Sequence, residues 1–274
     1  MDLRLTYTNH KGESVAIGGT GHLHLMETDL FSHAWGWETD GAGVATSIVP
    51  REIRLPIGMF GGSLAERTRA HEVLDADAIE DMLGALSFNG YSLPCTPVAA
   101  SLGAWWFADG IEERTVTLVS PRPLWSKAVR HSLPAPTMLS DGWLDLPCDA
   151  PYDVKQGSMA RILTVRTARP CEWRWIVYGP AANPYVIIDG NRHEVDVTVP
   201  AGSRLELDTR DRTVFLIGQT GARTNVFDAR LRGNDGSGHY AFKPIPNGFL
   251  TVSSDDSVSF DIVVYDERME PAWA

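Results

Sequence analysis

The chain has 274 residues, a formal net charge of −11 and a hydrophobic fraction of 43%. This length is sufficient for one large domain or two medium ones, and the hydrophobic fraction argues against a disordered chain. The acidic residues are spread along the sequence without a basic patch, which disfavours binding to nucleic acids or membrane surfaces. No run of 18 apolar residues predicts a membrane-spanning helix, and the first residues lack a signal-peptide pattern, so we expect synthesis in the cytoplasm.

The N-terminal part begins with alternating strand patterns. Residues 3–8 and 14–17 are expected to pair as a hairpin around the turn at residues 9–12, which contains Asn and Gly. Residues 35–43 are expected to form a loop or an edge strand.

The pattern becomes helical near residue 63. Ser63 and Glu66 have the spacing of a capping box, in which the serine oxygen accepts a first-turn amide and the glutamate reaches back. Asp77 and Glu80 repeat this spacing. Together with apolar residues at helical intervals, these boxes predict one helix, or two abutting helices, over about residues 63–83.

A second hairpin and a domain boundary are predicted after the helix. Asn89-Gly90 between apolar residues is typical of a type I′ turn, so residues 86–95 are expected to form a hairpin. Residues 114–119 alternate as a further strand. The stretch from about 132 to 150 is rich in Pro, Asp and Ser, and we therefore divide the chain into residues 1–135 and 136–274.

The second half has an all-β pattern. Its longest consistent run, residues 178–217, predicts an antiparallel meander with a type I′ turn at Asp189-Gly190. The expected strands are residues 185–188, 195–199, 205–207 and 213–217, followed by 225–231, 239–242, 249–252 and 258–265. The chain is therefore expected to be mainly β, with a smaller β domain that carries one helix and then an antiparallel β-sandwich.

The sequence contains no nucleophile elbow, zinc-protease motif, phosphate-binding loop or EF-hand pattern, and no cofactor is implied. His22 and His24 lie two residues apart on a predicted strand and so point to one side, as two ligands of one metal would. No third ligand has a recognisable spacing, so we interpret them as a solvated or partly packed pair and assign no metal. Cys95, Cys148 and Cys171 are odd in number and widely spaced, and we expect them to behave as small buried residues.

Four tryptophans are the candidate surface aromatics: Trp35, Trp37, Trp105 and Trp106. They fit stacking on sugar rings, or packing in a core or a subunit interface, and packing is the favoured interpretation.

Acidic pairs are also present, for example Asp109 with Glu112 and Asp255 with Asp256. A glycoside hydrolase needs two carboxylates at a defined distance across a cleft. The sequence does not give that distance, so we assign no catalytic residue.

The order of several motifs resembles the distal tail proteins of siphophages. The motifs are LRLTYTNHKGESVAI at the start, FNGYSLPC leading to LVSPRPLW, IVYGPAANPYVIIDGNRHEVDVTVPAGSRLELDTRDRTVFLI, NVFDARL, IPNG and the closing SFDIVVYDERMEPAW. Each motif alone only indicates a turn between strands. Their order along the chain is the specific feature, and it covers nearly the whole sequence.

This resemblance implies an N-terminal β-sandwich with a helix that assembles into a six-fold ring, and a galectin-like C-terminal β-sandwich that points outward. It implies a structural adaptor of the virion tail tip rather than an enzyme. The implied partners are further copies of the chain, the tail tube protein, the tail-associated hub or lysin protein and the tape measure protein, with DNA passing through the ring. Contact with a receptor-binding protein is left open, and the galectin sugar-binding signature is not found.

Two other functions remain as alternatives. A carbohydrate-binding β-sandwich for host adhesion would use Trp35 or Trp106 to bind cell-wall glycan. A glycan-active enzyme would depend on one of the carboxylates.

Overall fold

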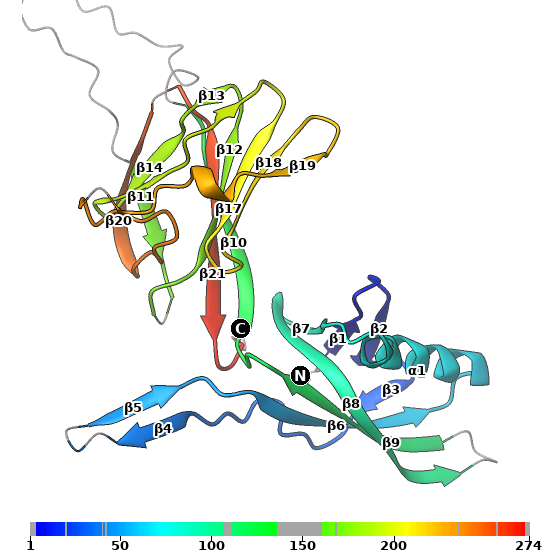
Figure 1. The fold of residues 1–274 in the computed structure, drawn as a ribbon. Helices are drawn as coiled ribbons and strands as arrows, with labels where there is room; N and C mark the ends of the chain where they lie inside the picture. Colours follow the sequence, from blue (N-terminus) through cyan, green and yellow to red (C-terminus); the bar gives the residue numbers. More distant parts are fainter. Residues whose placement is uncertain are drawn as a thin grey trace, which may run out of the picture. The chain divides into compact units, whose positions relative to one another are not determined.

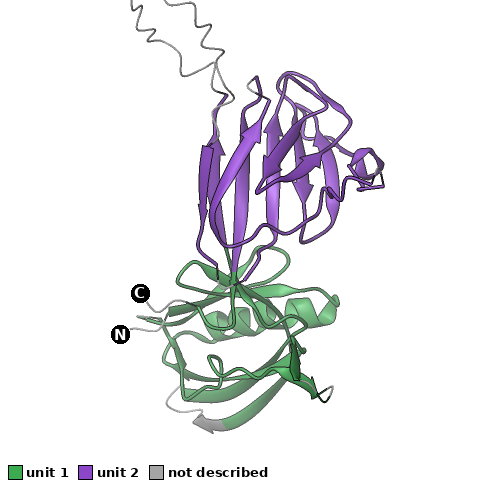
Figure 2. Cartoon of the chain, turned by 90° about the vertical axis from the view of Figure 1, so that its left-hand side faces the viewer, with its two compact units in different colours: residues 1–127, 267–274 green, residues 128–266 purple. Residues whose placement is uncertain are grey.

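The computed structural model describes residues 4–19, 21–39, 41, 43–106, 111–135, 161–167, 169–234, 236–255 and 257–271, without the side chains of residues 104–106. The chain divides into two compact units (Figure 2). Unit 1 contains residues 1–127 and 267–274, and unit 2 contains residues 128–266. Residues 136–160, which include Cys148, lie outside the described residues. The domain boundary predicted after residue 135 borders this segment and stays a prediction.

Unit 1 is built from antiparallel strands and one helix (Figure 1). The elements are β1 (Arg4–Thr8), β2 (Ser14–Gly18), β3 (Leu23–Leu25), β4 (Gly36–Thr39), β5 (Val44–Ser47), β6 (Arg51–Phe60), α1 (Leu64–Ile79), β7 (Gly84–Phe88), β8 (Tyr91–Trp106), β9 (Ile111–Ser120) and the start of β10 (Trp125–Leu133). One run of paired strands has the order β2-β1-β7-β8, and a second has the order β8-β9-β6-β3. The long strand β8 thus belongs to both, because Tyr91–Cys95 pairs with β7 and Thr96–Trp106 pairs with β9.

Helix α1 begins with the capping box that the sequence predicts. The Glu66 amide donates to the Ser63 hydroxyl at 3.2 Å, and the Ser63 amide donates to the Glu66 carboxylate at 2.7 Å. The helix ends at Ile79, before the predicted limit at residue 83, because Glu80 caps it and Asp81 has a positive φ of 52°.

Ser63→Ala is expected to lower the free energy of unfolding of unit 1 by about 1 kcal/mol, because it removes the acceptor for a first-turn amide. Thr68→Ala is the control, since the exposed Thr68 hydroxyl donates to the Leu64 carbonyl of the same helix, and the loss of unfolding free energy is expected to stay within about 0.5 kcal/mol. Urea titrations followed by circular dichroism measure both. Equal losses in the two variants would contradict a capping role for Ser63.

The second predicted capping box is wrong. Asp77 lies within α1 and is completely buried. Its carboxylate accepts hydrogen bonds from the Tyr7 hydroxyl and from the His10 amide, the latter at 2.9 Å. The Asp77 carboxylate therefore accepts hydrogen bonds from the β1–β2 hairpin instead of capping the start of a second helix.

Unit 2 is an antiparallel sandwich. Its elements are the rest of β10, β11 (Arg161–Val165), β12 (Trp173–Tyr178), β13 (Ala181–Ala182), β14 (Tyr185–Ile188), β15 (Asn191–Glu194), β16 (Thr198–Val199), β17 (Arg204–Asp208), β18 (Thr213–Ile217), β19 (Arg223–Asn225), a 3-10 turn at Phe227–Ala229, β20 (Gly248–Ser254) and β21 (Phe260–Arg268). One sheet has the order β19-β18-β17-β12-β21-β10, and the other has the order β11-β20-β14-β15. Inward residues of both sheets, among them Trp173, Trp175 and Leu250, form the core.

The predicted four-stranded meander over residues 178–217 is wrong in its pairing. The hairpin of β14 and β15 lies in one sheet, while β17 and β18 lie in the other. Val195 and Val199 are buried as their alternation predicts, but the chain around them crosses from one sheet to the other. Alternation of apolar and polar residues predicts which face of a strand is buried, but it does not predict which strand pairs with it.

The two predicted type I′ turns are confirmed. Asn89 and Gly90 have φ values of 50° and 78°, and Asp189 and Gly190 have 47° and 77°. Both pairs connect adjacent antiparallel strands. The strand expected at residues 225–231 is wrong, because β19 ends at Asn225 and Phe227–Ala229 is a 3-10 turn, and the short strand expected at residues 239–242 is not present either. The mainly β fold with one α-helix in the described residues is confirmed. No helix in this part of the chain is long and apolar enough to span a bilayer.

Candidate interaction surface

The hairpin of β4 and β5 in unit 1 exposes apolar side chains, and we call residues 35–49 the arm. Its strands pair only with each other. Trp37 is 68% exposed and Val44 is 65% exposed. Because Trp37 pairs with Thr46 and Thr39 pairs with Val44, all four side chains share one face of the hairpin. The arm therefore presents an apolar face that nothing within the described chain covers.

The local sequence allows the arm to fold but does not bury it. A Cβ built on Gly36 would lie 2.6 Å from the Ser47 hydroxyl and 2.6 Å from a Val49 methyl, so a larger residue here would have to displace these two side chains. A lone two-stranded hairpin is marginally stable in water. Exposed apolar surface on such a hairpin is characteristic of a protein interaction site.

The structure places the four candidate tryptophans in two regions. Trp35, which is 43% exposed, and Trp37 both belong to the arm. Trp105 and Trp106 end β8, where they pair with Glu112 and Ile111 of β9, and their side chains lie outside the described residues. In Figure 1 this end of β8 and β9 lies across unit 1 from β4 and β5. The roles of the four tryptophans in sugar stacking or in interface packing stay predictions.

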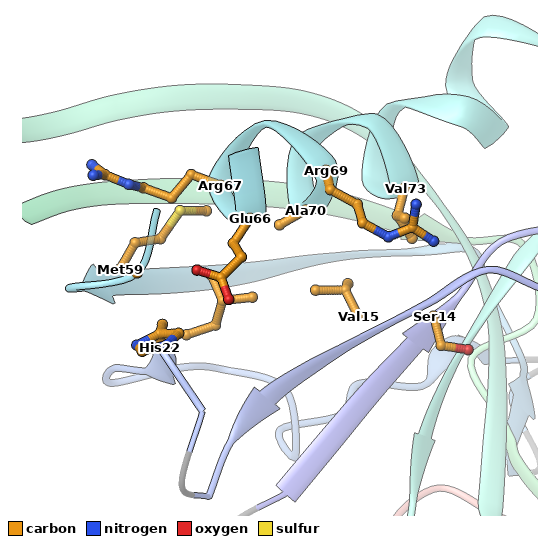
Figure 3. Close-up of a pocket in the computed structure, with 11 residues that line it drawn as sticks. Ser14, Val15, His22, Met59, Glu66, Arg67, Arg69, Ala70 and Val73 are labelled. Carbon is orange, nitrogen blue, oxygen red and sulfur yellow. The ribbon is translucent and has the colours of Figure 1, made fainter. Parts of the chain in front are cut away.

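A pocket under α1 is a feature that the sequence did not indicate (Figure 3). It encloses about 170 Å³. Its floor and walls are apolar and come from four elements, namely Val15 of β2, Leu23 of β3, Met59 of β6, and Ala70 and Val73 of α1. The strands β2 and β3 are the edges of the two runs of strands, so the pocket lies where these edges approach each other beneath the helix.

The rim of this pocket carries charged and polar groups. Figure 3 shows Glu66 reaching toward His22, with Arg67 and Arg69 to either side. The Glu66 carboxylate is held by the Ser63 amide and hydroxyl, and these hydrogen bonds lower the pKa of Glu66. Arg67 has no carboxylate within 4 Å among the described residues, and its Nε is buried without a hydrogen-bond acceptor. Glu66 thus keeps its negative charge, Arg69 is paired with Glu13, and Arg67 is the rim cation that lacks a carboxylate partner among the described residues.

Helix α1 is anchored to the β1–β2 hairpin at its other end. Burial would raise the pKa of Asp77, but hydrogen bonds from Tyr7 and His10 outweigh it and hold that pKa below its usual range. Burial, reinforced by Asp77, raises the pKa of the Tyr7 hydroxyl well above its usual range. Tyr7 thus remains a donor and Asp77 an ionised acceptor, and this pair fixes the position of the helix over the sheet.

The two histidines that were considered as metal ligands, His22 and His24, have local packing partners. The His24 ring lies 5.6 Å from the Phe60 ring, while His22 lies beside Glu66. Among the described residues there is no group of three His, Cys, Asp or Glu side chains that would hold a metal. Cys95 and Cys171 are buried.

Each of the two acidic pairs has one member outside the described residues, namely Asp109 and Asp256. Glu112 accepts from the Arg114 Nε at 2.8 Å. Asp255 accepts from the Ser257 amide at 2.9 Å, which lowers the pKa of Asp255. These two carboxylates are thus engaged in local hydrogen bonds.

Comparison with solved structures places the fold among phage tail components. A chain of the phage P2 baseplate in its activated conformation with Ca has a TM-score of 0.61 at 10% identity, covering 99% of this chain and 100% of its own. SPP1 Dit (gp 19.1), described as a paradigm of the hub adsorption apparatus in phages that infect Gram-positive bacteria, has a TM-score of 0.58 at 13% identity, covering 97% and 99%. The phage p2 baseplate in its activated conformation with Sr gives 0.61 at 10% identity, covering 99% and 100%.

No protein-family model matches the chain, and no curated protein matches it by sequence. The similarity is therefore one of fold, and it extends over nearly the full length of both chains. The predicted resemblance is confirmed at this level: the chain has the fold of the distal tail protein Dit.

Proposed function

We propose that this protein is a structural adaptor of a phage tail tip, a distal tail protein without enzymatic activity. The proposal rests on the fold that it shares with SPP1 Dit and with phage baseplate chains over 97% or more of its length. In this role, unit 1 forms a homohexameric ring that joins the tail tube protein to the tail-associated hub protein. The tape measure protein and then DNA pass through the ring, and the location is the virion tail.

The arm supports this proposal independently of the fold comparison. A monomeric protein rarely keeps two exposed tryptophans on a projecting hairpin unless a partner covers them. Aromatic residues are enriched at the centres of protein interfaces. Ring assembly would cover such a surface on every copy.

The first test is the solution mass of the purified chain by light scattering over a concentration series, followed by electron microscopy. The expected result is a mass that rises toward six times that of one chain, with ring-shaped particles. A chain that stays monomeric at the highest attainable concentration would count against the ring.

A carbohydrate-binding module is the second candidate, favoured only by the exposure of Trp35 and Trp37. It predicts saturable binding to host cell-wall glycan that is lost in Trp35→Ala. Rings without glycan binding would exclude it.

A further inference from the structure

We propose that the pocket under α1 receives the Trp37 side chain from the arm of a second copy of this chain. The inference rests on the proposed ring and identifies the contact between neighbouring copies. The observations that carry it are the size of the pocket, the charges on both surfaces and their positions in unit 1.

The pocket matches one aromatic side chain in size and chemistry. Its volume is about 170 Å³, and its walls are the aliphatic groups of Val15, Leu23, Met59 and Val73. An apolar cavity of roughly 150 Å³ accommodates a benzene ring. Trp37 is the most exposed tryptophan among the described side chains, and it stands on the apolar face of the arm beside Val44.

The charges of the two surfaces are complementary. The arm carries Glu38 and Asp40 and contains no lysine or arginine. Glu38 has no basic partner within 4 Å among the described residues. At the pocket rim, Arg69 is paired with Glu13, whereas Arg67 has no carboxylate within 4 Å among the described residues. Arg67 therefore offers a cation to pair with Glu38 of an incoming arm.

The arm and the pocket cannot meet within one copy. Figure 1 shows β4 and β5 at one end of unit 1 and α1 at the other. Contact between two different surfaces of identical chains is head-to-tail, and such contacts generate a ring when the rotation closes. A pocket and an arm at opposite ends of one unit therefore provide each copy with two neighbours.

The edges of β2 and β3 beside the pocket offer further contacts to an incoming hairpin. Each of these strands is paired on one side only. Edge strands with unpaired backbone groups are common sites of association with another chain. An arm that inserts Trp37 would reach this seam at the same time.

The proposal is tested by mixing two full-length proteins that carry one new cysteine each. Thr46→Cys labels the arm face beside Trp37, and Arg69→Cys labels the pocket rim. Cys148 is changed to serine in both, while Cys95 and Cys171 are buried. A short bismaleimide should link the two proteins to each other. Thr46→Cys mixed with Phe249→Cys, an equally exposed position in unit 2, should give no product.

A second measurement compares Trp37→Ala with Phe249→Ala by light scattering. Phe249 is 79% exposed, so it controls for loss of an exposed aromatic side chain. Trp37→Ala is expected to weaken self-association at least about 30-fold, the loss of a central aromatic anchor, and Phe249→Ala less than about twofold. Both variants should melt like the wild-type protein because neither side chain is in the core.

The outcomes separate the docking from the ring. Self-association that persists in Trp37→Ala, without crosslinking from position 46 to position 69, overturns the docking and leaves the ring proposal intact. A wild-type chain that never self-associates overturns both. Crosslinking with loss of association in Trp37→Ala alone supports the docking.

Discussion

Replacing Gly84 by alanine is expected to lower the free energy of unfolding of unit 1 by at least about 3 kcal/mol. A Cβ at this position would overlap the Asp77 carboxylate and the Tyr7 hydroxyl, and it would lie 2.8 Å from the Thr8 carbonyl oxygen. The first two groups form the buried pair that holds α1, and the third is backbone. The extra methyl group must therefore separate a buried hydrogen bond or displace a strand.

Gly43→Ala is the control for this prediction, since a Cβ built on Gly43 meets nothing within 4 Å. Chemical denaturation of both variants, followed by helix circular dichroism, provides the comparison. If Gly84→Ala unfolded at the denaturant concentration of Gly43→Ala, the close packing of α1 against Gly84 would be refuted.

Acidification from pH 7 to pH 4 is expected to destabilise unit 2 by about 3 kcal/mol through His193 alone. The imidazole is buried, and burial lowers the pKa of His193 to about 4. Its Nδ1 donates to the Ala241 carbonyl oxygen at 2.9 Å, and its Nε2 lies 2.9 Å from the Asn191 side-chain amide, which also donates to the Tyr240 carbonyl. A second ring proton would thus face a donor.

The sign follows from proton uptake. The unfolded chain binds a proton at His193 below pH 6.5, its ordinary pKa, whereas the folded chain does so only near pH 4. Between these values the unfolded state holds more protons, so stability falls as pH falls. His71 has a pKa lowered mainly by burial and acts in the same direction in unit 1.

Hydrogen exchange of peptides from β12 at pH 6.5 and pH 4.5 reports unit 2 separately from unit 1. His193→Gln should remove most of the pH dependence between these values, while His71→Gln should leave exchange in β12 unchanged. The same loss of protection in wild type and His193→Gln would show that another group carries the effect.

Local chemistry made the turns and the helix start predictable from the sequence. Asn89-Gly90 and Asp189-Gly190 specify positive φ values without reference to the rest of the chain. Ser63 and Glu66 satisfy each other within one turn of helix. The order of motifs over the whole chain predicted the fold, although each motif alone was weak.

Features that depend on distant parts of the chain were not predictable in this way. Asp77 and Ser63 have the same local pattern, but only Asp77 meets Tyr7 from a strand 70 residues earlier. Trp37 and Trp173 are each followed by a charged residue and then alternate in a strand, yet Trp37 is exposed and Trp173 is buried. The pocket under α1 assembles from four separate elements, so no single stretch of sequence contains its signature.

The return of residues 267–274 to unit 1 makes unit 2 an insertion within the chain of unit 1 rather than a C-terminal appendage. Glu267 accepts from Arg122 at 2.7 Å, and Glu270 lies 3.1 Å from the His33 ring. A fragment that ends near residue 135 would lack both Glu267 and Glu270. A chimera that exchanges unit 2 between two related chains therefore needs two junctions, one on each side of unit 2, because a single junction would join residues 1–127 to a C-terminal segment of the other chain.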